Sequence, residues 1–284
     1  MREHHVSCLN SRGFHRLHYT DWGDPANPRA VICVHGLTRN CRDFDALAAA
    51  LQDELRVICV SIAGRGRSDW LPNPEDYGYP QYMADMTALV ARVTATGASD
   101  LSWVGTSMGG MLGMLLAARP NTPLRRLVLN DVGTVIPKAS MARIGAYVDK
   151  NPLFASFAEL EQYVRTVSAP FGPLTDAQWR HLAEHNAKQH ADGRWGMNYD
   201  PDIAQPFRKA AAKDIMLWNY YDALRCPTLL LRGAESDLLL RETALEMTRR
   251  GPQPQLVEFA GVGHAPALMA DEQIAAISDF LLRT

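Results

Sequence analysis

The sequence lacks the features that would direct it to a membrane, to a nucleic acid or to an oxidising compartment. Residues 1–6 contain no apolar signal stretch, and no apolar run reaches the length of a transmembrane helix. The formal net charge of −2 provides no basic surface for nucleic acid or an anionic membrane. The five cysteines form no C-x-x-C pair. We therefore expect free thiols, a cytoplasmic protein, and neither a nucleic acid nor a membrane as partner.

Apolar, strand-like runs alternate with helical patterns through most of the 284 residues. The predicted strands are Arg16–Trp22, Ala30–Val34, Arg56–Ile62, Leu101–Val104, Leu127–Leu129, Pro227–Leu231 and Leu256–Phe259. The predicted helices are Asp43–Leu51, Gln81–Thr94, Gly110–Ala118, Glu242–Arg249 and Asp271–Leu282. This alternation predicts an α/β fold with a mostly parallel sheet that is covered by helices on both faces.

One segment, residues 133–222, interrupts this alternation with helical signals and no clear strand. It holds 12 of the 23 aromatic residues, in less than a third of the chain. We therefore predict a core domain of residues 1–132 and 223–284, with residues 133–222 inserted as a helical cap. Open α/β sheets bind ligands at their carboxyl edge, so we expect aromatic side chains of the cap, such as Trp218, to line an apolar pocket there.

The most informative stretch is Gly105-Thr-Ser-Met-Gly109, which joins the predicted strand Leu101–Val104 to a buried helix. This is the G-x-S-x-G pattern in the strand–turn–helix context of a nucleophile elbow. The sharp turn exposes the hydroxyl of Ser107, and the glycines allow the strand and the helix to cross closely. Ser107 is the predicted nucleophile.

A serine nucleophile needs a base, and the base needs a group that orients it. His264, in the loop after the last predicted strand, is the predicted base. The orienting acid should follow a strand, and the sequence offers Asp237 after Pro227–Leu231, with Asp131 and Glu235 as rivals. We favour Asp237, which gives the order serine, aspartate, histidine along the chain.

The reaction also needs donors for the oxyanion of its transition state. The backbone N–H of Met108, directly after the nucleophile, is the first candidate. The second is the N–H of Leu37, in the loop that follows the strand Ala30–Val34. His35 in the same loop is interpreted as a buried brace for the loop and not as a second base.

A zinc site is the main competing pattern. His181, Glu184 and His185 form an H-x-x-E-H sequence, in which two histidines share one face of a helix. The surrounding helix is polar, and no third ligand is evident from the sequence. We therefore predict no metal ion and no organic cofactor.

Five landmarks in order, His35-Gly36, Gly64–Asp69, Gly105–Gly109, Ser236-Asp237 and Gly263-His264, resemble those of the α/β-hydrolase superfamily. The capped, bacterial-type esterases and carbon–carbon-bond hydrolases are the most similar branches. The sequence departs from the usual pattern at Ser61, where an aspartate is common. A serine at the elbow argues against haloalkane dehalogenases and epoxide hydrolases, which use aspartate there.

The resemblance and the residues together imply a serine hydrolase that cleaves a small, mainly apolar carboxylic ester through an acyl-enzyme on Ser107. One alternative is hydrolysis of a carbon–carbon bond in a vinylogous diketone. A second alternative, outside enzymes, is a small-molecule receptor built on the same fold.

Overall fold

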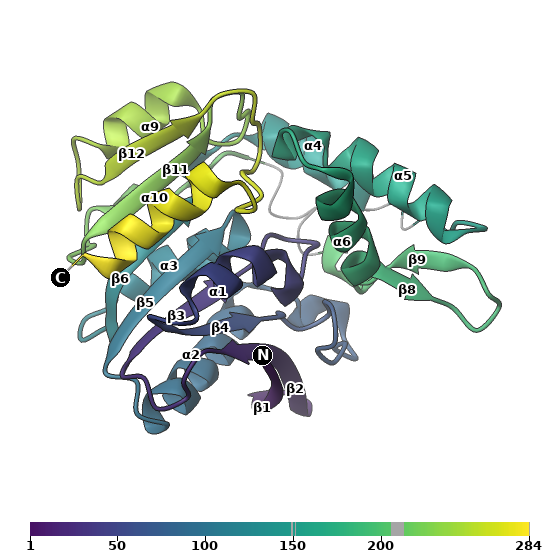
Figure 1. Cartoon of the computed structure of the whole chain (residues 1–284), viewed down its shortest axis with the longest axis horizontal. Helices are drawn as coiled ribbons and strands as arrows, with labels where there is room; N and C mark the ends of the chain where they lie inside the picture. Colours follow the sequence, from purple (N-terminus) through teal and green to yellow (C-terminus); the bar gives the residue numbers. More distant parts are fainter. Residues whose placement is uncertain (149, 151, 206–212, 284) are drawn as a thin grey trace.

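The centre of the molecule is an eight-stranded sheet. Figure 1 shows its strands together with the helices that flank them. The computed structural model describes residues 1–148, 150, 152–205 and 213–283. The strand order is β1-β2-β4-β3-β5-β6-β11-β12. The strands are β1 (Arg2–Asn10), β2 (Gly13–Trp22), β3 (Arg29–Val34), β4 (Arg56–Val60), β5 (Asp100–Thr106), β6 (Leu124–Asn130), β11 (Thr228–Gly233) and β12 (Gln255–Phe259).

The sheet is parallel from β4 to β12, and only β1 and β2 run antiparallel to their neighbours. This confirms the predicted mostly parallel α/β sheet. Strand β1 was not predicted, because the histidine-rich start of the chain shows no apolar pattern. It pairs with β2 along its whole length at the edge of the sheet, where one face stays exposed and polar residues are tolerated.

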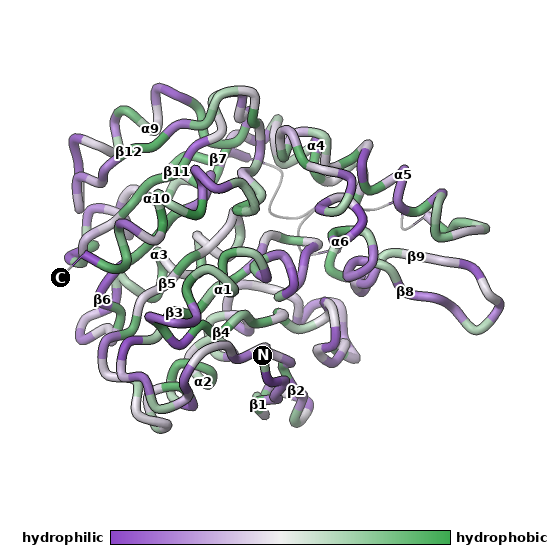
Figure 2. The backbone as a smooth tube through the Cα atoms, in the orientation of Figure 1, coloured by the Kyte–Doolittle hydropathy of each residue, from purple (hydrophilic) through white to green (hydrophobic). Residues whose placement is uncertain are grey.

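Two layers of helices cover the two faces of the sheet. The core helices are α1 (Asp45–Leu51), α2 (Tyr79–Ala95), α3 (Met108–Ala117), α9 (Arg241–Met247) and α10 (Asp271–Leu282). Buried residues of α2, α3 and α9 belong to one hydrophobic core, and those of α1 and α10 belong to a second one on the opposite face. Figure 2 shows hydrophobic colour along the central strands between these layers. Fully buried parallel strands are apolar on both faces, which explains their continuous apolar sequences.

The segment predicted as an insertion projects to one side of the sheet in Figure 1. Its helices are α4 (Lys138–Val148), α5 (Phe157–Val167), α6 (Asp176–Asn186) and α8 (Trp218–Tyr221). The segment also forms two small antiparallel pairs, from β7 (Val135–Ile136), β8 (Ala187–Gln189), β9 (Trp195–Met197) and β10 (Ile215–Met216). These strands of two or three residues are too short for a sequence period, so the expectation of helices alone was wrong. Residues 149, 151 and 206–212 of the predicted insertion lie outside the described residues.

Hydrogen bonds tie this segment to the core. The hydroxyl of Tyr77 donates to Asp200 Oδ2 at 2.6 Å, and Asn40 Nδ2 donates to the carbonyl of His185 at 2.9 Å. The backbone N–H of Gly263, next to the predicted base, donates to the carbonyl of Pro170 at 2.6 Å. The segment is therefore held directly over the loops at the carboxyl ends of the strands. Within the described part of the chain, no helix combines the length and the apolar character needed to cross a membrane.

Candidate active site

Ser107 lies in a tight turn between β5 and α3. Its φ of 53° and ψ of −113° place it in a conformation that L-residues rarely adopt. A Cβ atom on Gly105 would collide with the carbonyl oxygen of Gly109, and one on Gly109 would collide with the carbonyl oxygen of Val34. The two glycines of the elbow are therefore required by close backbone approach, as the sequence predicts.

A line of hydrogen bonds starts at the Ser107 hydroxyl. His264 Nε2 lies 3.0 Å from Ser107 Oγ, and His264 Nδ1 lies 2.7 Å from Asp131 Oδ2. Asp131 is fully buried and also accepts a hydrogen bond from the N–H of Gly233 at 2.9 Å and from the hydroxyl of Ser236 at 2.6 Å. These donors hold the carboxylate in place, and the carboxylate in turn orients the imidazole so that Nε2 faces the serine.

The structure does not place Asp237 beside His264, which corrects the preferred acid of the sequence analysis. Asp237 is half-exposed, and its carboxylate accepts hydrogen bonds from Arg143 Nε at 2.6 Å and Arg143 Nη2 at 2.8 Å. Glu235 is also exposed. The loop after β11 turns these carboxylates outward, whereas β6 lies next to β5 in the sheet and delivers Asp131 to the buried side of His264. The sequence signal for Asp131 was its place at the end of an apolar strand, which Asp237 shares.

The two candidate oxyanion donors lie close to the serine. Met108 is the first residue of α3, so its N–H belongs to the helix turn that has no partner within the helix. Leu37 and Met108 both line the cavity beside Ser107. A Cβ atom on Gly36 would lie 3.7 Å from the Ser107 Cβ, which shows how closely this loop approaches the nucleophile. Leu37 and Met108 therefore lie close enough to Ser107 for their amides to remain the candidate donors to an oxyanion.

His35 is a fully buried residue of the same loop. Its Nδ1 lies 2.6 Å from the carbonyl of Gly36, and its Nε2 accepts from the N–H of Ile62 at 3.0 Å. Burial lowers the pKa of His35 to about 4, so the ring is neutral at neutral pH and both nitrogens are occupied. This is the arrangement expected for a brace, and it leaves no nitrogen free to act as a base.

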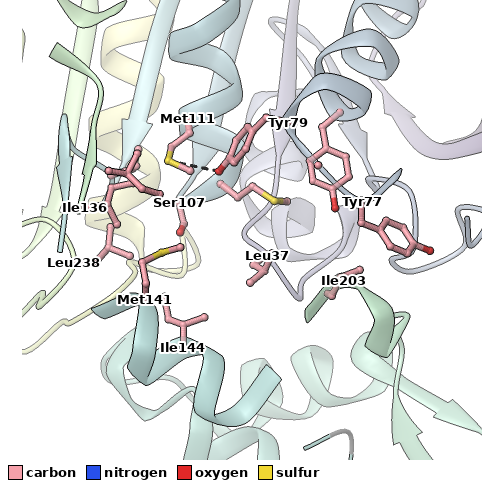
Figure 3. Close-up of a pocket in the computed structure, with 15 residues that line it drawn as sticks. Leu37, Tyr77, Tyr79, Ser107, Met111, Ile136, Met141, Ile144, Ile203 and Leu238 are labelled. Carbon is pink, nitrogen blue, oxygen red and sulfur yellow. Dashed lines mark hydrogen bonds between the residues drawn. The ribbon is translucent and has the colours of Figure 1, made fainter. Parts of the chain in front are cut away.

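An apolar cavity of about 190 Å³ opens at Ser107. In Figure 3, which shows this cavity, Ile136 and Leu238 lie to the left of Ser107, and Tyr79 and Leu37 lie to its right. The described aromatic side chains that line this apolar cavity are those of Tyr77, Tyr79 and Tyr82, which precede the predicted insertion. From the described residues of 133–222 it receives only aliphatic and thioether side chains: Ile136, Met141, Ile144, Ile203 and Ile215.

Aromatic side chains of the insertion line a second, smaller cavity that also opens at Ser107. This polar cavity, of about 80 Å³, is lined by Gly36, Leu37, Thr38, Arg39, Thr106, Ser107, Arg143, Ile144, Tyr147, Tyr163, Val167, Ser168, Phe171, Met197, Tyr199, His264 and Ala265. Trp218 lines neither cavity, because its ring packs against Tyr221 and lies under the guanidinium of Arg250. The expectation for Trp218 was therefore wrong, and the described aromatic residues of the segment that lie near Ser107 line the second cavity instead of the apolar one.

Two groups of side chains in the described residues have the composition of a metal site. His181 and His185 lie near Asp45, which is the third group that the H-x-x-E-H pattern alone did not reveal. The Asp45 carboxylate, however, already accepts hydrogen bonds from Arg42 Nε at 2.8 and 2.9 Å. The positive charge of Arg42 disfavours the binding of a metal cation at the same carboxylate. The second group is Cys8, His15 and Asp85, where burial raises the pKa of the thiol to about 12 and disfavours the thiolate that a metal requires. Neither group touches Ser107.

Comparisons with known proteins agree with this geometry. A family model described as the alpha/beta hydrolase family matches residues 31–277. The chain is 47% identical over 283 residues to a 3-hydroxybutyrate-oligomer hydrolase of Cupriavidus necator, with 97% of this chain and 96% of the relative covered. It is 30% identical to an esterase of Mycobacterium tuberculosis, over 81% of this chain and 73% of the relative.

Solved structures show the same fold. A crystal structure of an alpha/beta hydrolase from Novosphingobium aromaticivorans superposes with a TM-score of 0.88 and 37% identity, and covers 100% of this chain and 98% of that chain. The sheet order, the elbow and the family match all point to one assignment. The chain belongs to the alpha/beta hydrolase family, and it is a hydrolase.

Proposed function

We propose that the chain is a serine hydrolase that cleaves short esters of a small hydroxy acid, such as oligomers of 3-hydroxybutyrate, through an acyl-enzyme on Ser107. The observation that carries this proposal is the hydrogen-bonded line from Ser107 through His264 to Asp131, which opens onto an apolar cavity. The 47% identity to a 3-hydroxybutyrate-oligomer hydrolase supports the substrate class.

In the proposed reaction, His264 accepts the proton of Ser107 as the hydroxyl oxygen attacks the ester carbonyl. Asp131 stabilises the imidazolium that forms, and the N–H groups of Leu37 and Met108 bind the oxyanion. His264 then donates the proton to the leaving alcohol. Water attacks the acyl-enzyme by the same sequence of proton transfers and releases the acid.

We assign residues 133–222 the role of a cap that shapes the binding site and takes no part in the chemistry. The segment contributes side chains to both cavities, but none of Ser107, Asp131 and His264 belongs to it. Small acyl groups with apolar branches suit the apolar cavity, because its lining is almost entirely hydrocarbon and thioether.

The test measures hydrolysis of the linear dimer of 3-hydroxybutyrate and of nitrophenyl esters of graded acyl length. Ser107→Ala should lower kcat by about 10⁴-fold, because only binding and oxyanion stabilisation remain. A fluorophosphonate probe should label the native protein at Ser107. Ser278→Ala is the matched control, since that hydroxyl bonds to its own helix, at Ile274, and lies in neither cavity.

Three outcomes would contradict the proposal. Labelling of a different serine on active protein would remove Ser107 as the nucleophile. Turnover of a vinylogous diketone far above that of every ester would favour carbon–carbon bond cleavage. Binding of the dimer without multiple turnover would favour a receptor.

A further inference from the structure

The polar cavity carries two cationic side chains beside the nucleophile and no carboxylate. Arg39 and Arg143 line it together with Ser107 and His264, whereas no aspartate or glutamate is among its described lining residues. The aspartates that pair with the two arginines, Asp43 and Asp237, lie outside its lining. A surface of this kind, with Arg39 buried and Arg143 exposed, is suited to an anionic group of the substrate.

Each arginine is held in place by one edge of its guanidinium. Arg39 donates from Nε and Nη2 to Asp43 at 2.7 and 2.8 Å, and its guanidinium carbon lies 5.4 Å from the ring centre of Phe171. Arg143 uses the same two nitrogens for Asp237. Among the described residues, neither Nη1 has a hydrogen-bond partner. The guanidinium groups are therefore oriented in advance and keep donors for a further acceptor.

The position of His264 decides which part of an ester occupies this cavity. His264 must donate a proton to the leaving alcohol oxygen, so the alcohol part lies on the side of the imidazole. His264 lines the polar cavity and not the apolar one. The acyl part then faces the apolar cavity, and the alcohol part faces the arginines.

We propose that the polar cavity binds a free carboxylate on the alcohol part of the substrate, with Arg143 and Arg39 as its specificity-determining residues. The inference rests on the proposed function and makes it more specific. In a linear oligomer of a 3-hydroxy acid, the leaving alcohol itself ends in a carboxylate, a short carbon chain away from the leaving oxygen. The enzyme then removes units from the carboxyl end and prefers free acids to esters that are capped at that end.

Two tyrosines of the insertion complete this subsite. Tyr147 and Tyr163 line the polar cavity, and burial raises the pKa of both hydroxyls. Both therefore remain protonated and can donate to a carboxylate oxygen. A carboxylate in this cavity would meet two cations and two neutral donors.

The test compares kcat/KM for the 3-hydroxybutyrate dimer as the free acid and as its methyl ester. We expect the native enzyme to prefer the free acid. Arg143→Gln should reduce the ratio of the two kcat/KM values by about 10-fold or more, because a charge-assisted contact is lost. Arg143→Lys should restore part of the ratio. Arg180→Gln is the control, since Arg180 is exposed on α6, pairs with Glu184 and lies in neither cavity.

A binding measurement separates this inference from the proposed function. Free 3-hydroxybutyrate should inhibit the hydrolysis of nitrophenyl acetate competitively, and Arg143→Gln should raise its inhibition constant by a similar factor. Equal rates on acid and methyl ester in the native enzyme, or a ratio unchanged by Arg143→Gln, would overturn the subsite and leave the ester hydrolase intact. If neither dimer nor nitrophenyl ester is cleaved, the proposed function itself fails.

Discussion

The loops that follow β6 and β11 each place an aspartate at the carboxyl edge of the sheet, yet the two side chains have opposite surroundings. Asp131 is fully buried and accepts hydrogen bonds from Gly233 and Ser236 in addition to its contact with His264. Asp237 is half-exposed and pairs only with Arg143 among the described residues. The same residue type thus serves as a candidate catalytic acid in one loop and as a surface ion pair in the other.

The comparison shows that a carboxylate near an active site is defined by its neighbours and not by its place after a strand. The loop that contains Asp237 still contributes to the site, because its Ser236 and Gly233 hold the Asp131 carboxylate. The candidate acid and its supporting donors therefore follow different strands, since Ser236 and Asp131 lie 105 positions apart in the sequence.

The largest expected effect separates the two aspartates directly. Asp131→Asn should lower kcat on a nitrophenyl ester by about 10⁴-fold, because an amide favours the wrong tautomer of His264. Asp237→Asn should change kcat by less than about threefold, because an exposed ion pair contributes little. Steady-state kinetics on both variants, with circular dichroism to confirm folding, measures the contrast. A reversal of the two effects would return Asp237 to the role of the acid.

A similar contrast between a buried and an exposed side chain applies to His35 and Gln189. Burial lowers the pKa of His35 from 6.5 to about 4, so below about pH 6.5 the unfolded chain binds a proton that the folded chain resists. This contribution to stability is complete above pH 6.5 and is lost as the pH falls toward 4. Between about pH 7.5 and pH 5 it amounts to about 2 kcal/mol.

Urea unfolding at these two pH values measures the difference for each variant. His35→Gln should reduce the loss of stability on acidification by about 2 kcal/mol, whereas Gln189→Ala, at an exposed residue of the β8–β9 hairpin that does not titrate, should leave that loss unchanged. An identical pH dependence in the native protein and in His35→Gln would show that His35 is not a buried neutral group.

The smallest effect compares two side chains of the proposed cap. Met141 lines the apolar cavity, and Trp218 faces Tyr221 and Arg250 instead. Met141→Ala should shift the ratio of kcat/KM between long and short acyl esters about 10-fold toward the longer one, since it adds room for roughly one or two methylenes. Trp218→Ala should shift that ratio by less than about twofold. A larger shift for Trp218→Ala than for Met141→Ala would place the acyl group near Trp218 and not in the apolar cavity.

Much of the fold could be predicted from local patterns in the sequence. The parallel strands are recognisable in the sequence as continuous apolar runs, because both of their faces are buried. The glycines of the elbow are required because the backbone approaches too closely there to leave room for a Cβ atom. Strand β1 and the short pairs β7–β10 and β8–β9 escaped prediction because an exposed edge and strands of two or three residues impose no readable period.

The sequence alone was enough to predict Ser107 as the nucleophile, because the elbow is encoded within five consecutive residues. It was also enough to predict His264 as the base, because one histidine follows the last strand at a glycine-rich turn. The choice between Asp131 and Asp237 belonged to the tertiary structure, since both follow apolar strands and differ only in which way their loops turn. The same holds for the two cavities, whose linings combine residues from Gly36 to Ala265. The conformation of a turn such as the elbow depends on neighbouring residues and can therefore be predicted from the sequence. The burial of a side chain and its distance from a remote loop depend on how the strands of the sheet pack together.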